Sequence, residues 1–337
     1  MINVAINGFG RIGRNFLRAV LQDEEIKKKL RVAVINVGTA NVESVAHMFK
    51  YDTIMGTYPA DVRIKKGELR IGDYRINIIA ETDPKKIAWY EFGIDWVVDA
   101  SGKFTDRKGA ALHLESGAKK VLITAPAKDE DVTIIPGVND TDYNPKKHNI
   151  VSLGSCTTNA IVPMLKILQD NFTIKHGFMT TIHAYTNTQV LLDVERRDLR
   201  RARAAALNII PTSTGATKVI GKVLPDLDGL IGGTAIRVPV ATVSLIDLVF
   251  VTEENVTSKN INKVFTSASK RSPFKGIVAI TDEPLVSSDY IGNNFSVVID
   301  GLLTDAKENV GKLFGWYDNE WGYSVRLKDF LLSVTVS

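Results

Sequence analysis

The fold is decided near the N-terminus, where residues 2–16 read INVAINGFGRIGRNF. An apolar, strand-like run at residues 3–7 leads into a glycine loop, and an amphipathic helical pattern follows over residues 11–30. Gly8, Gly10 and Gly13 have the G-x-G-x-x-G spacing, which permits a tight turn and close approach of the backbone to a ligand. Amides at the start of the next helix can hold a pyrophosphate there. The stretch predicts dinucleotide binding, with a purely structural glycine turn as the alternative.

Alternation of strand-like and helical segments continues through the first half. Apolar runs at residues 32–35, 96–100, 121–124 and 132–135 are separated by polar or helical stretches. This alternation is typical of parallel β-α-β units. We therefore expect an α/β fold whose N-terminal domain, residues 1–155, is a Rossmann-type doubly wound sheet.

The pattern changes near Cys156, where a helix is expected to begin. Long strand-like runs follow, with few helices between them, and they favour an α+β domain with a mixed or antiparallel sheet. The runs cover residues 178–184, 234–251, 276–281, 295–300 and 312–317. We assign this second domain to residues 156–319 and expect a C-terminal helix within residues 320–337.

Length and composition agree with two globular domains. The 337 residues exceed what one hydrophobic core usually serves. With 45% hydrophobic and 24% charged residues, the chain is neither disordered, collagen-like nor a disulfide scaffold. A net charge of +4 is too small to predict binding to nucleic acid or a membrane surface. We expect no signal peptide and no membrane span, and a single cysteine favours a cytoplasmic location.

That cysteine, Cys156, stands in SCTTN at residues 155–159, where a strand gives way to a helix. The positive end of a helix dipole favours a thiolate. The alternative is a buried filler, against which the polar neighbours argue. His183, in a strand-like run, forms a thiolate–imidazolium pair with Cys156 if the two meet, and is otherwise a core histidine. The remaining histidines show no metal-ligand spacing, so no metal is expected.

Several motifs together resemble phosphorylating glyceraldehyde-3-phosphate dehydrogenase. They are SCTTN at residues 155–159, HAYT at 183–186, PTSTGA at 211–216 and WYDNEWGY at 316–323, and residues 3–15 and 198–206 agree as well. The resemblance runs from Asn3 to about Phe330. It implies oxidation of glyceraldehyde 3-phosphate to 1,3-bisphosphoglycerate with NAD and inorganic phosphate, in glycolysis or gluconeogenesis. It also implies a homotetramer whose C-terminal helix packs back on the dinucleotide domain.

The resemblance assigns site residues by position. Cys156 becomes the nucleophile and His183 its base. The resemblance assigns binding of the substrate's phosphate to Thr186 and Arg237. It assigns binding of inorganic phosphate to Ser155, Thr157, Thr214, Gly215 and Arg201, with Arg200 as the alternative to Arg201. It assigns binding of the dinucleotide to Gly8, Gly10, Arg11, Ile12, Gly13, Val37, Thr82 and Thr124, and contact with the nicotinamide carboxamide to Asn319.

Cofactor choice is where the chain departs from the family pattern. Val37 stands where NAD-preferring members carry an aspartate that binds the ribose and repels a 2′-phosphate. Thr82 likewise replaces an arginine near the adenine. Glu195, in a loop that reaches a neighbouring subunit in the family, is repulsive to that phosphate. We expect NAD to be preferred over NADP, with weakened discrimination.

Other functions remain as alternatives. Erythrose-4-phosphate dehydrogenase shares much of the pattern, and aspartate-semialdehyde dehydrogenase shares the two-domain plan without the phosphate motifs. A catalytically silent dinucleotide-binding protein is the alternative from a different class. An arginine run near residue 200 resembles the family's intersubunit loop rather than a nucleic-acid patch. Ala160 replaces a second cysteine common in the family, which removes a disulfide partner for Cys156.

Overall fold

The computed structural model describes residues 1–335, which divide into two compact units. The first unit comprises Met1–Ile134, Thr141–Gly154 and the described residues from Ser324 onward, and the second comprises Ile135–Asp140 and Ser155–Tyr323. The chain passes between them at Ser155, one residue before the expected boundary. The segment Ile135–Asp140 belongs to the second unit, although the sequence pattern had assigned it to the first. The last two residues of the expected C-terminal helix lie outside the described part.

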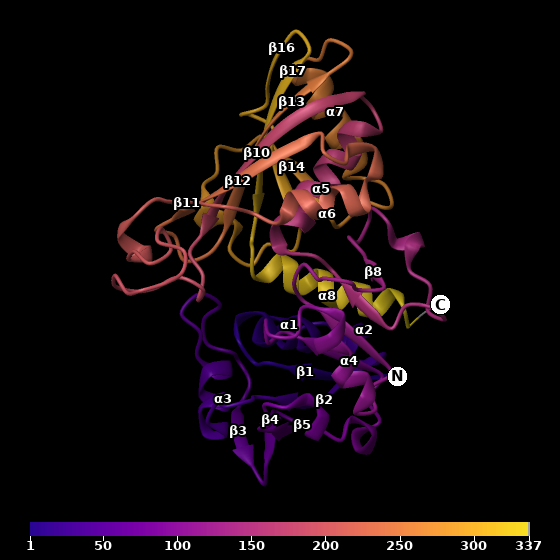
Figure 1. Ribbon diagram of the computed structural model, residues 1–337, viewed down its shortest axis with the longest axis vertical. Helices are drawn as coiled ribbons and strands as arrows, with labels where there is room; N and C mark the ends of the chain where they lie inside the picture. The colour runs from indigo at the N-terminus through magenta and orange to yellow at the C-terminus, as the bar shows by residue number, and fades with distance from the viewer. Residues whose placement is uncertain (336–337) are drawn as a thin grey trace. The chain divides into compact units, whose positions relative to one another are not determined.

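The first unit contains a nine-stranded sheet in the order β3-β4-β5-β2-β1-β6-β7-β9-β8. Figure 1 shows the strands β1 to β5 of this sheet in indigo and purple. The pairs that involve β1, β2, β6, β7, β8 and β9 are parallel, and β3-β4-β5 form an antiparallel edge. This is the expected doubly wound sheet. The strands are β1 Ile2–Asn7, β2 Leu30–Asn36, β3 Val62–Lys65, β4 Glu68–Ile71, β5 Tyr74–Ile79, β6 Trp96–Asp99, β7 Lys120–Ile123, β8 Val132–Thr133 and β9 Ile150–Ser152.

Helices of the first unit are α1 Arg11–Leu21, α2 Glu24–Lys27, α3 Val42–Lys50 and α4 Arg107–Glu115. The amphipathic run at residues 11–30 is therefore not one helix. Asp23 interrupts it because its carboxylate accepts a hydrogen bond from the Ile26 amide at 3.1 Å and begins α2. The antiparallel strands at residues 62–79 carry short patterns that the sequence analysis did not single out.

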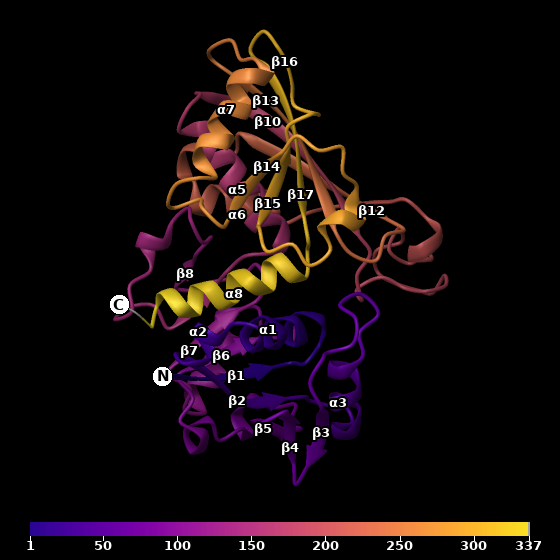
Figure 2. The same ribbon diagram turned by 180° about the vertical axis from the view of Figure 1, so that it is seen from behind.

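The C-terminal helix α8, Trp321–Ser333, belongs to the first unit from Ser324 onward. Lys328 forms an ion pair with Asp23 at 2.9 Å, and the Phe330 ring meets Trp96 edge-on at 5.8 Å between centroids. Figure 2 shows α8 as a yellow helix alongside α1 and α2. Within residues 1–335, no helix is long and apolar enough to cross a membrane.

The second unit is built on an eight-stranded mixed sheet. Its order is β11-β12-β10-β13-β17-β15-β14, with β16 paired to β17. The predicted strand at residues 234–251 is two strands, since the chain turns over residues 239–243, where Pro239 lacks an amide hydrogen and Val243 has φ +67°. The strands are β10 Ile174–Ala184, β11 Ile210–Thr212, β12 Ile231–Val238, β13 Ser244–Thr252, β14 Val278–Thr281, β15 Val297–Asp300, β16 Asp305–Lys307 and β17 Val310–Tyr317, and the helices are α5 Cys156–Gln169, α6 Ala216–Val223 and α7 Ser258–Ala268.

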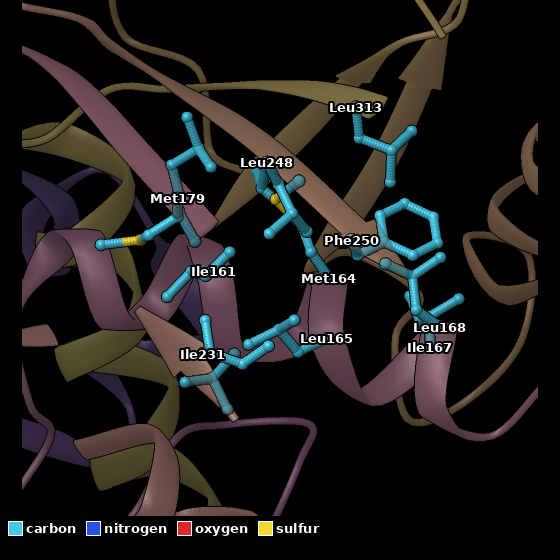
Figure 3. Packing of buried hydrophobic residues seen from close by; sticks show 14 of the residues in the cluster. Ile161, Met164, Leu165, Ile167, Leu168, Met179, Ile231, Leu248, Phe250 and Leu313 are labelled. Atoms are coloured by element: carbon cyan, nitrogen blue, oxygen red, sulfur yellow. The ribbon is translucent and has the colours of Figure 1, made fainter. Parts of the chain in front are cut away.

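Packing of α5 against this sheet forms the main core of the second unit (Figure 3). Each fully buried aliphatic or aromatic side chain contributes about 1.5–3 kcal/mol. Because strand side chains alternate between faces, Met179, Thr181 and His183 of β10 share one face. Met179 packs in the α5 core, so His183 is carried on the face that α5 covers. The packed side chains include Ile161, Met164, Leu165, Leu168, Met179, Leu248 and Phe250.

Candidate functional site

The position of Cys156 is set by the way α5 begins. Ser155 is the N-cap, and its hydroxyl accepts a hydrogen bond from the Thr158 amide at 3.2 Å. The Thr158 hydroxyl accepts in return from the Ser155 amide at 2.6 Å. This reciprocal pair starts the 14-residue helix at Cys156. The thiol therefore lies at the positive end of a helix dipole.

His183 meets that thiol from the sheet. Its Nε2 lies 3.5 Å from Cys156 Sγ, while its Nδ1 lies 2.7 Å from the carbonyl oxygen of Ala184. Two neighbours of Nδ1 make opposite demands, since the Ala184 carbonyl only accepts and Arg237 Nη1, 2.7 Å away, only donates. We assign the proton to Nδ1, the tautomer that leaves the Nε2 lone pair facing the thiol, and in it the Arg237 hydrogen bond goes to the Ala184 oxygen and not to the ring. The two residues that the sequence singled out for nucleophilic chemistry are thus neighbours.

Arg237 is the third member of the cluster. It lies opposite His183 in the parallel pair of β10 and β12. Its Nη1 donates to the Ala184 oxygen at 2.9 Å and lies 2.7 Å from His183 Nδ1. Its buried Nε has no hydrogen-bond partner among the described residues. A buried guanidinium donor without a protein partner suits an anionic ligand.

Burial and the guanidinium also determine the charge states. Burial, with a further contribution from Arg237, lowers the pKa of His183 to about 3. Burial raises the pKa of the Cys156 thiol, and Arg237 only partly opposes this. Both shifts favour the neutral thiol and neutral imidazole. The expected thiolate–imidazolium pair is therefore not the resting state that these surroundings favour.

Tyr317 is a member of the cluster that sequence reasoning missed. Its buried hydroxyl lies 3.0 Å from Thr157 Oγ1 and 2.8 Å from Thr181 Oγ1. Its ring stands edge-on to His183, with 6.0 Å between centroids. Tyr317 therefore links the first turn of α5 to β10. Its position within WYDNEWGY was visible, but only the pairing of β17 with β13 brings it here.

A second cationic group lies near the pair. The Arg201 Nε donates to Thr212 Oγ1 at 3.0 Å, and the guanidinium is close enough to His183 to lower its pKa. Arg200 is exposed instead, with its amide bonded to Asp198. Of the two candidate arginines, Arg201 is the one that the second unit brings near His183.

The other predicted phosphate ligands have partners of their own. The Ser155 hydroxyl caps α5, and the Thr157 hydroxyl contacts Tyr317. Thr186 Oγ1 lies 2.9 Å from Thr188 Oγ1, and Thr214 Oγ1 accepts from the Ala216 amide at 3.2 Å. Each hydroxyl still has a second hydrogen-bonding capacity. Gly215 caps α6 without a side-chain bond, and open space surrounds it.

The glycine loop of the first unit has a backbone that only glycine fits at two of its three glycine positions. Gly8 has φ +94°, and a Cβ there would lie 2.6 Å from Ser101 Cα. A Cβ on Gly13 would lie 2.3 Å from the Gly8 oxygen. Gly10, in contrast, has open space around it and begins α1 without a side-chain cap. The uncapped helix start beside open space suits an anionic ligand.

The remaining predicted dinucleotide residues have mixed environments. Arg11 pairs with Asp52, and Ile12 is half-buried next to it in α1. Val37 is buried and Thr82 is exposed. The Thr124 hydroxyl donates to the backbone carbonyl oxygen of Asp99 at 2.9 Å. In the second unit, the Asn319 oxygen accepts from Ser244 Oγ at 2.9 Å. Across residues 1–335, no cluster of histidine, cysteine or acidic side chains suits a metal ion.

Comparison with known proteins gives one consistent result. Residues 2–107 match the family model described as glyceraldehyde 3-phosphate dehydrogenase, NAD binding domain, and residues 155–319 match the C-terminal domain of the same enzyme. The chain is 48% identical over 331 residues to glyceraldehyde-3-phosphate dehydrogenase of Geobacillus stearothermophilus, covering 97% of this chain and 96% of that one. It is 46% identical over 336 residues to glyceraldehyde-3-phosphate dehydrogenase 1 of Bacillus cereus, covering 99% of both chains.

Proposed function

The chain belongs to the glyceraldehyde-3-phosphate dehydrogenase family, and from that premise we propose how its own residues oxidise glyceraldehyde 3-phosphate. It is an NAD-dependent oxidoreductase of this type, and relatives with this name along nearly the whole chain disfavour the erythrose-phosphate and silent-sensor alternatives. The single observation that carries the proposed roles is the contact of Cys156 Sγ with His183 Nε2 at 3.5 Å.

His183 acts first as a base. Its neutral Nε2 takes the thiol proton while the sulfur forms a bond to the aldehyde carbon, which gives a thiohemiacetal on Cys156. The lowered pKa keeps the His183 ring unprotonated at neutral pH before the substrate arrives, but it also makes the ring a weaker base. The protonated ring and the Cys156 amide then stabilise the negative oxygen.

The thiohemiacetal next loses a hydride and becomes a thioester on Cys156. Bound NAD supplies the hydride acceptor. Inorganic phosphate attacks the thioester carbon, the carbon–sulfur bond breaks, and the leaving sulfur regains a proton from His183. The products are the acyl phosphate and the free thiol. A thioester retains energy for this last transfer that an ordinary ester would not conserve.

Two anion sites serve this reaction. We assign the substrate phosphate to Arg237 and Thr186, because the buried Arg237 Nε has no partner among the described residues. We assign inorganic phosphate to Arg201 with Thr214, Gly215, Ser155 and Thr157. Negative charge at Arg237 offsets the cation that lowers the pKa of His183, so substrate binding also makes His183 a stronger base.

The first unit is proposed to hold the dinucleotide, and Asn319 to orient its nicotinamide carboxamide. Three features support a dinucleotide in the first unit: α1 begins without a side-chain cap, open space surrounds Gly10, and a Cβ at Gly8 or Gly13 would clash with the neighbouring backbone. NADP remains a competing ligand because Val37 presents no carboxylate.

We further propose a homotetramer in the cytoplasm. The loop over residues 186–209 exposes leucines that a lone subunit would leave in water, with Leu191 86% and Leu199 81% exposed. Exposed apolar clusters of this kind mark protein interfaces. Light scattering tests the assembly, and cell fractionation tests the location.

The reaction is tested by following reduced nicotinamide with glyceraldehyde 3-phosphate, with and without phosphate. We expect phosphate-dependent turnover by the wild type and at most a trace by Cys156→Ser, which retains dinucleotide binding. Substantial turnover by the serine variant would exclude the thioester route, and phosphate-independent turnover would exclude the acyl-phosphate step. Erythrose 4-phosphate serves as the comparison substrate.

A further inference from the structure

A chain of buried polar side chains runs through the first unit, beneath the carboxyl ends of its central strands. It consists of His113 on α4 and Asp99, Asn7 and Asn36 at the ends of β6, β1 and β2, all nearly or fully buried. His113 Nε2 lies 3.1 Å from Asp99 Oδ2. Asn7 donates to the same oxygen at 3.1 Å, and Asn36 donates to Asn7 Oδ1 at 2.7 Å. We call these four residues the polar chain.

Each bond of the polar chain has a defined direction. The indole of Trp89 can only donate, and its Nε1 lies 3.1 Å from His113 Nδ1. His113 must therefore accept at Nδ1 and carry its proton on Nε2, from which it donates to Asp99. Because the Asp99 carboxylate only accepts, Asn7 presents its amide nitrogen there and its oxygen to Asn36. A buried network with every orientation determined specifies one arrangement of the strands that carry it.

One end of the polar chain reaches two turns at the sheet edge. Asn36 Oδ1 accepts from the Gly38 backbone amide at 3.2 Å and from the Glu81 backbone amide at 3.0 Å. Asn36 Nδ2 donates to the backbone carbonyl oxygen of Glu81 at 2.8 Å. One side chain thus joins the turn after β2 to the turn after β5. Val37 and Thr82, the expected adenosine contacts, lie within these two turns.

The other end reaches the glycine loop. Asp99 Oδ1 accepts from the Ser101 amide at 2.9 Å and from its hydroxyl at 2.6 Å. The Ser101 backbone in turn packs against Gly8, so closely that a Cβ there would lie 2.6 Å from Ser101 Cα. The polar chain therefore contacts the turns that follow β2, β5 and β6, and through Ser101 it reaches the loop after β1. Ligands of doubly wound sheets bind outside these carboxyl ends.

We propose that the polar chain positions the turns that bind the adenosine half of the dinucleotide, with Asn36 as its key positioning residue. This inference rests on the proposed dinucleotide site. Burying polar groups is costly unless all are paired, so an apolar core would serve stability equally well. What the polar chain adds is directional bonding between three strand ends and their turns. That is valuable here because Val37 supplies no carboxylate to the ribose.

The test replaces Asn36 by alanine and measures binding of NAD and of AMP, which probes the adenosine half alone. We expect the Kd of Asn36→Ala to rise about tenfold for both ligands, equivalent to 1.4 kcal/mol. The KM for glyceraldehyde 3-phosphate and kcat at saturating NAD stay unchanged. Amide hydrogen exchange at Gly38 and Glu81 accelerates without ligand, whereas exchange in β7 does not.

Val121→Ala is the matched control because Val121 is fully buried in β7 and makes no side-chain bond to the polar chain. An equal rise in Kd in both variants at matched Tm, or no rise in Asn36→Ala, would overturn the inference. Asn36→Asp covers the case in which alanine prevents folding. Aspartate still accepts from both amides but cannot donate to Asn7 or Glu81, so its Kd must also rise. Failure of the wild type to bind NAD or AMP would instead contradict the proposed function.

Discussion

At the scale of the residue, two arginine side chains contribute to the electrostatic surroundings of His183, which contacts Cys156. Arg237 contacts His183 directly, and Arg201 acts on it from farther away. Both cations make protonation of His183 unfavourable. A phosphate bound at either arginine, as proposed above, would offset the contribution of that cation but not the larger contribution of burial.

The two adjacent arginines give a direct test at this scale. Arg201→Leu should raise the KM for inorganic phosphate by about 10- to 100-fold, the usual effect of losing a charge-assisted hydrogen bond. Arg200→Leu is the matched control and should leave that KM unchanged, because Arg200 is exposed. Steady-state kinetics with varied phosphate provide the measurement. A larger rise in the KM for inorganic phosphate in Arg200→Leu than in Arg201→Leu would assign the inorganic-phosphate site to Arg200 instead.

At the scale of the element, helix starts determine where the functional groups lie. The reciprocal Ser155–Thr158 bonds begin α5 at the cysteine, and Gly10 begins α1 without a side-chain cap. Asp23 combines two such roles, since it caps α2 and holds Lys328 of α8. Burial works to raise the pKa of Asp23, but the Lys328 ammonium and the Ile26 amide outweigh it, so the pKa lies below its ordinary value.

We therefore expect Asp23→Ala to destabilise the protein by about 1 kcal/mol, the usual cost of a lost cap. The stabilisation by Asp23 is complete above the ordinary aspartate pKa of about 4 and is lost as the pH falls through the lowered folded-state value. Denaturant unfolding across this pH range measures the difference between variant and wild type. Glu24→Ala, which removes an exposed neighbouring acid, is the control. A difference that grows toward acid would contradict the assignment.

At the scale of the whole molecule, the proposed tetramer bears on the choice between NAD and NADP. Val37 offers neither hydrogen bonds to the ribose nor repulsion of a 2′-phosphate. Glu195 lies in the fully exposed stretch at residues 191–200, in the loop proposed to meet a neighbouring subunit. The preference for NAD over NADP would then be carried across a subunit interface rather than within one sheet.

Glu195→Ser should raise the NADP/NAD ratio of kcat/KM, and Val37→Asp should lower it, by roughly tenfold for each 1.4 kcal/mol of altered binding. Glu253→Ser removes an exposed acid elsewhere in the second unit and is the control for net charge. Kinetics with both cofactors measure the ratio. A wild type that already prefers NADP, or a ratio that Glu195→Ser leaves unaltered, would show that Glu195 does not act on the ribose.

Elements with local signals could be predicted from the sequence alone. The glycine spacing at residues 8–13 predicted the strand, turn and helix, since the backbone conformation at Gly8 and the close packing at Gly13 follow from residue type. The helix start at Cys156 was likewise predicted from the change of pattern there. The break at Asp23 was missed because an amphipathic pattern continues on both sides of a cap.

Contacts between residues far apart in the chain could not be predicted in this way, because they depend on strand pairing and packing. Strand pairing brings His183 beside Arg237 and carries Tyr317 to Thr181, although 136 residues separate those two. The polar chain depends in the same way on the order of β2, β1 and β6 in the sheet. Hydrogen bonds between strand ends have no periodicity along the chain. Charge states are equally non-local, since burial by the surrounding fold sets the pKa of both Cys156 and His183.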